Sequence, residues 1–116
     1  MSEQKVNVDK LEEVKQAGTV IKLSRPVVWE DVEYKELTLR FDDLTGEDVI
    51  DAESEFMDFV AGKKNVFVAL KDQHPAYLAV LAAKAAGVHP NMTKLLSAKD
   101  FKKVTGAAQR FLTDLG

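Results

Sequence analysis

The fold is decided by residues 20–40, VIKLSRPVVWEDVEYKELTLR, which read as two β-strands around a short turn. Apolar residues in the first half recur with the two-residue period of a strand. Pro26 has no amide hydrogen, so it belongs at a strand edge or in a β-bulge, and Glu30-Asp31 is the expected turn. We therefore predict a β-hairpin over residues 18–41. Because an isolated hairpin is marginally stable in water, it must pack on the rest of the chain, on a partner, or on both.

The second strand of this hairpin has apolar residues at both even-numbered and odd-numbered positions, which point to opposite faces of a strand. One set is Val32 and Tyr34, and the other is Leu37, Leu39 and Phe41. A regular strand cannot place both sets on one face. Either a bulge falls near Lys35-Glu36, or the two sets bury against different surfaces.

Two aromatic residues of the hairpin are candidate partner-binding residues. They are Trp29 and Tyr34, because aromatic side chains near a strand edge often anchor interfaces. The alternative is that both rings pack on the helices. The sequence leaves this choice open.

Four helices are expected after the hairpin, over residues 45–61, 75–87, 90–96 and 98–115. Residues 45–48 and 97–100 have the pattern of helix N-caps. Pro75 and Pro90 suit the first turn of a helix, and Gly87 suits a helix end.

Apolar stripes support the first and last of these helices. The first stripe is Val49, Ile50, Phe56, Met57 and Val60, and the last is Phe101, Val104, Ala108, Phe111, Leu112 and Leu115. Residues 62–73 fit a short strand or a helical turn, and both alternatives stay open.

The chain of 116 residues has the size of one domain, with 46% hydrophobic and 30% charged residues and no cysteine. We predict an α+β protein, mostly α, in which the hairpin packs on a small helical bundle. Residues 18–116 would form this single domain, and the polar residues 1–17 a flexible arm. No apolar run approaches the length of a membrane span.

Few residues suggest a reaction. The carboxylates of Asp48, Asp51 and Glu55 lie at helical spacing and are candidates for a metal site, but a solvated acidic face explains them more simply. His74 and His89 each precede a proline at a helix start, where a capping or surface position is expected. With no phosphate-binding or nucleophile motif in the sequence, we expect no enzyme activity, no cofactor and no metal.

Residues 81–97 raise an alternative, a small helix-turn-helix DNA-binding regulator. Gly87 would make the turn, and Asn91, Thr93 and Lys94 would face the major groove. Lys94 would be the one basic residue of the reading helix, and phosphate binding needs more positive charge. An ordinary helical corner is the simpler interpretation, so nucleic acid is not the expected partner.

Charge is unevenly distributed along the chain. Residues 1–61 hold 16 acids and 7 bases, a net charge of −9, and residues 62–116 hold 3 acids and 9 bases, a net charge of +6. Each half could simply carry its own solvated face, or the asymmetry could orient copies or a partner during docking.

In their order and spacing, these pieces resemble a family of phage tail assembly chaperones. Residues 20–53 are similar to the opening of that family, with a strand, a proline, a turn, ELTLR and a helix, and residues 77–112 are similar to its second half. The matching positions include Leu23, Pro26, Asp48, Leu81, Gly87, Leu96, Asp100, Phe101, Val104 and Phe111. The family often has a glycine in the turn, where this chain has Glu30-Asp31.

The resemblance implies a protein without catalytic activity that acts in the host bacterial cytoplasm and is absent from the mature virion. It would bind the tape measure protein, keep that long chain soluble and help recruit tail tube protein. Self-association, or a longer form made by ribosomal frameshifting, is left open by the resemblance.

Overall fold

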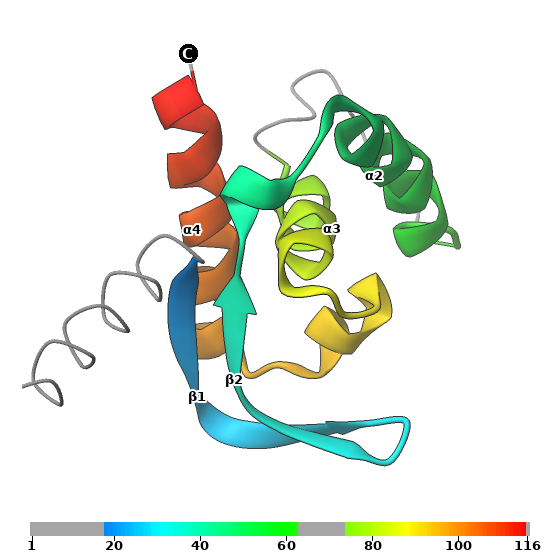
Figure 1. The fold of residues 1–116 in the computed structure, drawn as a ribbon. Coiled ribbons are helices and arrows are strands. Elements are labelled where there is room, and N and C mark those ends of the chain that lie inside the picture. The colour runs from blue at the N-terminus through cyan, green and yellow to red at the C-terminus, as the bar shows by residue number, and fades with distance from the viewer. Residues whose placement is uncertain (1–17, 63–73, 116) are drawn as a thin grey trace, which may run out of the picture.

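The computed structural model describes residues 18–62 and 74–115. Its elements are β1 (Thr19–Trp29), β2 (Val32–Leu39), the 3-10 helix η1 (Phe41–Asp43), α2 (Gly46–Phe59), α3 (Pro75–Ala86), the 3-10 helix η3 (Pro90–Leu95) and α4 (Ala98–Leu115). A β-hairpin packs on helices, which confirms the predicted α+β class (Figure 1). The predicted arm at residues 1–17 and nearly all of the ambiguous segment lie outside the described residues.

The hairpin has a break in its register. Strands β1 and β2 pair antiparallel, but the pairing shifts between Lys22, which lies opposite Glu36, and Val27, which lies opposite Tyr34. The extra residues belong to β1 and include Pro26, as expected for a residue that cannot donate to the ladder. The structure therefore locates the bulge on the first strand, across from Lys35. Such a bulge bends the strand, and the distal half of the hairpin curves under the helices in Figure 1.

The predicted turn at Glu30-Asp31 is confirmed, and both residues have left-handed backbone angles, with φ of 50° and 68°. Two positive φ values in succession match the tight turns whose twist fits the right-handed twist of the flanking strands. This chain makes that turn without glycine.

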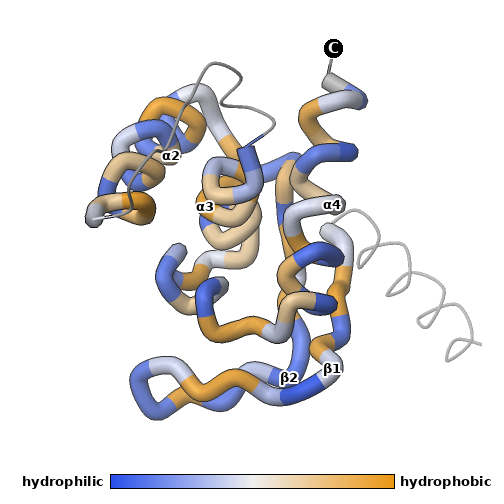
Figure 2. The backbone as a smooth tube through the Cα atoms, turned by 180° about the vertical axis from the view of Figure 1, so that it is seen from behind, coloured by the Kyte–Doolittle hydropathy of each residue, from blue (hydrophilic) through white to orange (hydrophobic). Residues whose placement is uncertain are grey.

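Helix α3 is the centre of the molecule. Figures 1 and 2 both show it between α2 and α4, and most of its residues are buried. One hydrophobic cluster joins α3 to the hairpin, η3 and α4, and a second joins it to α2. Its many alanines allow this close approach from several sides. The predicted end at Gly87 is confirmed by a left-handed φ of 72°.

Helix α2 begins as predicted but buries a different face. Thr45 and Asp48 form a reciprocal capping box. The predicted stripe is wrong at two positions, because Ile50 is 70% exposed and Met57 is 61% exposed. The buried residues are Ala52, Phe56 and Phe59. Their spacing of four and then three residues traces the face that packs on α3.

Helix α4 packs on the core along its predicted stripe. Val104 and Ala108 are buried, whereas Phe101, Phe111 and Leu112 are half-buried against the core. The ring of Phe111 stacks on that of Phe41, with centroids 4.9 Å apart. The side chain of Leu115 lies outside the described residues.

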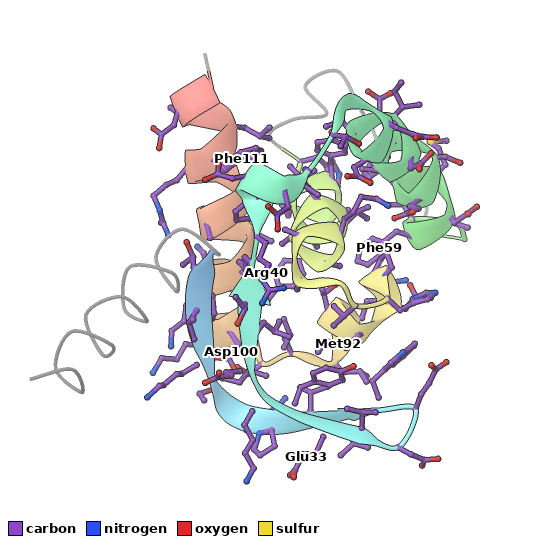
Figure 3. The ribbon with its side chains drawn as sticks, in the orientation of Figure 1. Glu33, Arg40, Phe59, Met92, Asp100 and Phe111 are labelled. Carbon is purple, nitrogen blue, oxygen red and sulfur yellow. The ribbon has the colours of Figure 1, made fainter. Side chains whose placement is uncertain are left out.

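A buried carboxylate ties the hairpin to α4. Asp100 is fully buried, and its Oδ1 and Oδ2 accept the Ser24 amide at 3.0 and 2.9 Å. The Ser24 hydroxyl donates to Oδ2 at 3.0 Å, and the Asp100 amide donates to Ser97 Oγ at 3.1 Å. Burial alone would raise the pKa of Asp100, but the hydrogen bonds from Ser24 and Ser97 and the attraction of Lys103 hold that pKa below its ordinary value of 3.8. This link holds the bend of β1 against the helical body. Figure 3 labels Asp100 near that bend.

Candidate partner-binding surface

The distal half of the hairpin brings the two predicted aromatic residues onto one face. Trp29 and Val27 share a face of β1, and Val27 lies directly opposite Tyr34, so the rings of Trp29 and Tyr34 lie on the same side of the sheet. Both are half-buried and pack against the core cluster. Trp29 stacks on His89, with ring centroids 5.4 Å apart and planes 28° from parallel. Part of each ring is therefore still accessible.

The opposite face of the distal hairpin is open. Val28 is 62% exposed there and pairs with Glu33. Val32, beside the turn, pairs with Trp29, so it lies on the aromatic face, where it is 49% exposed. Val32 thus adds an exposed apolar side chain next to the half-buried aromatic pair. This aromatic face has the character of a surface that can contact a partner.

The two histidines cap helices, one of the roles expected for them. His74 Nδ1 accepts the amide of Ala76 at 3.0 Å, and His89 Nδ1 accepts the amide of Asn91 at 3.0 Å. Each cap satisfies an amide that the first helical turn leaves unpaired.

A second accessible surface is a groove of about 610 Å³ where the end of α2, η3 and the start of α4 meet. Its apolar lining includes Phe59, Val60, Ala76, Leu96, Ala98 and Phe101. Lys94 and Lys102 are the charged residues among its described lining. We call this surface the α2–η3–α4 groove. The sequence patterns did not single it out, although Phe59, three residues after Phe56, was a signal for the buried face of α2.

Lys94 holds one wall of the α2–η3–α4 groove in place. Its Nζ donates to the carbonyl oxygen of Phe59 at 2.9 Å and lies 4.4 Å from the centre of the Phe59 ring. A cation beside the C-terminal carbonyls of a helix is favourable, and one over an aromatic ring adds to it. Figure 3 shows Phe59 reaching from α2 toward the segment that carries Met92.

These contacts argue against the alternative of a DNA-reading helix. The helix predicted over residues 90–96 is a 3-10 helix of 6 residues, Pro90–Leu95. In the DNA-binding alternative, its Asn91, Thr93 and Lys94 would face the major groove. Thr93 is 1% exposed and donates to the Pro90 carbonyl oxygen at 2.7 Å. Lys94 is held by α2. Neither side chain is available to read a base.

Two of the acidic residues of α2 that were candidates for a metal site have separate structural roles. Asp48 caps the helix through Thr45, and Glu55 pairs with Lys84 of α3 at 2.9 Å. Among the residues that the structure describes, no group of three or more His, Asp or Glu side chains is placed to hold a metal ion. No described helix is long and apolar enough to cross a membrane.

A hairpin with accessible aromatic side chains, beside an apolar groove rimmed by lysines, defines a class of small α+β protein suited to binding other proteins. Comparison with known protein families identifies the family. Residues 20–113 match the family described as phage tail assembly chaperone proteins E, 41 or 14. The chain belongs to this family of phage tail assembly chaperones, as the sequence resemblance indicated. No curated protein and no solved structure matches it.

Proposed function

We infer that this chaperone binds the tape measure protein of its own phage, keeps it soluble and helps recruit tail tube subunits during tail assembly. The observation that carries this proposal is the family match over residues 20–113. Membership of a chaperone family suggests a role without catalysis. The accessible surfaces described above suit protein binding and suggest no reaction.

The proposed mechanism is multivalent holding. A tape measure protein of this kind would be a very long helical chain, and a domain of this size would offer each stretch of it a small contact. Many copies bound along one chain then hold it far more strongly than any single contact would. This binding would take place in the host bacterial cytoplasm, before the virion is complete. Copies that also contact one another, or a longer frameshifted form, would add to the binding along the tape measure protein.

Trp29 and Tyr34 are proposed as part of the partner-binding surface. They lie together on the distal hairpin, and both are half-buried. Rigid aromatic side chains give a large contact area at a low cost in conformational entropy. Their contacts with the core and with His89 would position the rings before a partner arrives.

Replacing the tryptophan tests its role. Trp29→Ala should weaken co-purification with the tape measure protein while lowering the melting temperature by no more than about 2 °C, because the ring is only half-buried. Val28→Ala, a neighbouring change on the opposite face, is the matched control and should alter neither quantity. If Trp29→Ala instead lowers the melting temperature by several degrees and leaves co-purification intact, Trp29 serves the fold and not the partner.

Co-expression tests the larger proposal. The tape measure protein should be soluble and elute as a high-mass complex when it is produced with this chain, and it should precipitate when it is produced alone. Equal solubility in both cases, with no complex on size exclusion, would show that the chain is not the chaperone of that protein.

A further inference from the structure

We propose that the α2–η3–α4 groove docks an amphipathic helix of the protein being chaperoned, with acidic residues bordering the apolar stripe of that helix. This inference rests on the proposed function and names its contact surface and the chemistry of the bound segment.

The groove is large and apolar enough for several side chains. Its volume is about 610 Å³, whereas an apolar cavity of about 150 Å³ already holds a benzene ring. Phe59 and Leu96 form closely packed parts of its lining, at 8% and 7% exposure, and Phe101 is half-buried. An amphipathic helix presents three or four apolar side chains along one face, so it fits this space better than a single side chain does.

The walls are held in place by contacts within the described chain. Lys94 joins η3 to the end of α2, Thr93 bonds within η3, and Ser97 caps the start of α4. A groove that is already formed loses little conformational entropy on binding, which favours affinity. The same contacts prevent the groove from collapsing to bury its own apolar lining.

Charge selects the kind of helix. Lys94 and Lys102 line the groove, and its described lining contains no carboxylate. Lys102 is exposed, so its ammonium group can reach a partner. Acidic residues beside the apolar stripe of the bound helix would meet Lys102 and be attracted by the nearby positive charge of Lys94, and basic residues would be repelled.

Two designed peptides test this chemistry on the full-length chain. Both are amphipathic helices of about five turns, roughly 18 residues, with the same apolar positions, flanked by glutamate in one and by lysine in the other. By fluorescence anisotropy at low salt, the glutamate peptide should bind about tenfold tighter or more, and added salt should narrow the difference. Equal binding, or tighter binding of the lysine peptide, would overturn the proposal.

Variants locate the binding site. Lys102→Glu should weaken binding of the glutamate peptide about tenfold, whereas Lys99→Glu, an exposed change on the same helix outside the groove lining, should weaken it far less. Ala98→Trp should block the groove and reduce binding by a similar factor or more. Equal effects of the two charge reversals would overturn the assignment to this groove.

Amide chemical shifts separate the remaining outcomes. On adding the glutamate peptide, the shifts should change at Phe59, Leu96 and Phe101. Shift changes confined to Trp29 and Tyr34 would overturn the assignment of peptide binding to the groove. Contacts showing that residues 63–73 of the chain itself occupy the groove would overturn it too. If Lys102→Glu and Ala98→Trp still keep the tape measure protein soluble, the groove is not its binding site, while the proposed function stands. If the unaltered chain fails to keep that protein soluble, the proposed function fails whatever the peptides do.

Discussion

The carboxylate of Asp100 makes the polar connection between the hairpin and the helical body. Its oxygens accept hydrogen bonds from the Ser24 amide and from the Ser24 hydroxyl. The Asp100 backbone amide donates to Ser97 Oγ, which holds the residue at the start of α4. A fully buried carboxylate is tolerable only when such donors replace water. Because those donors favour the charged form, its pKa in the folded protein lies below the ordinary value.

Removing this carboxylate should cost stability in a pH-dependent way. Asp100→Ala should lower the free energy of unfolding by about 2 kcal/mol at pH 7, because the Ser24 amide and hydroxyl lose their acceptor. A lowered folded pKa gives stability that is fully present above the ordinary value of 3.8 and is lost as pH falls through the folded pKa. The difference between the two proteins should therefore narrow in acid.

Urea denaturation between neutral and acidic pH measures this difference. Asp114→Ala, an exposed change on the same helix, is the control and should cost less than about 0.5 kcal/mol. A loss for Asp100→Ala that is no larger than the control's would show that the connection does not stabilise the fold.

At the scale of elements, α2 has apolar residues on its buried side and also on its exposed side. Phe56 is fully buried and meets the rings of His74 and Tyr77 edge-on. Ile50 and Met57 lie on the outer side of the helix. Apolar spacing along a helix is therefore not enough to say which residues hold it to the core.

A pair of substitutions in α2 tests this assignment. Phe56→Ala should lower the free energy of unfolding by about 3–5 kcal/mol, because it leaves a cavity between α2 and α3. Ile50→Ser should change it by no more than about 0.5 kcal/mol, since the side chain is exposed and the two residues have similar helix propensities. Chemical denaturation compares them, and a loss above 2 kcal/mol for Ile50→Ser would mean that this face is covered.

At the scale of the whole molecule, α3 belongs to both hydrophobic clusters. Ala82 is fully buried on the side toward the hairpin cluster, and Leu81 is fully buried on the side toward α2. Loss of packing around α3 should therefore be felt by the hairpin and by the helices together. We expect the described domain to unfold in one transition.

Overpacking α3 tests this cooperativity. Ala82→Leu should destabilise the protein by about 1–3 kcal/mol, because the interior has no room for three more carbon atoms. Since Trp29 is the single tryptophan, its fluorescence reports the hairpin, while far-UV circular dichroism reports the helices. Both midpoints should shift together, and Ala98→Leu, at an exposed position, should shift neither. Separate midpoints would show that the hairpin and the helices unfold independently.

The sequence by itself determined the features whose causes lie within a few residues. The turn at Glu30-Asp31, the capping box at residues 45–48 and the start of α4 at residues 97–100 are all confirmed. These features depend on hydrogen bonds and backbone angles between near neighbours, so the local pattern is sufficient to predict them. The ordered match of such pieces also indicated the family.

Tertiary structure alone decided which strand carries the bulge, which face of α2 is buried, and how η3 is held. The Ser24–Asp100 link joins residues 76 apart in sequence, and the Lys94–Phe59 contact joins residues 35 apart. Because the free energy of these contacts comes from burial and from partners distant in sequence, no local periodicity encodes them. The α2–η3–α4 groove exists for the same reason, since its walls come from segments that only the packing around α3 brings together.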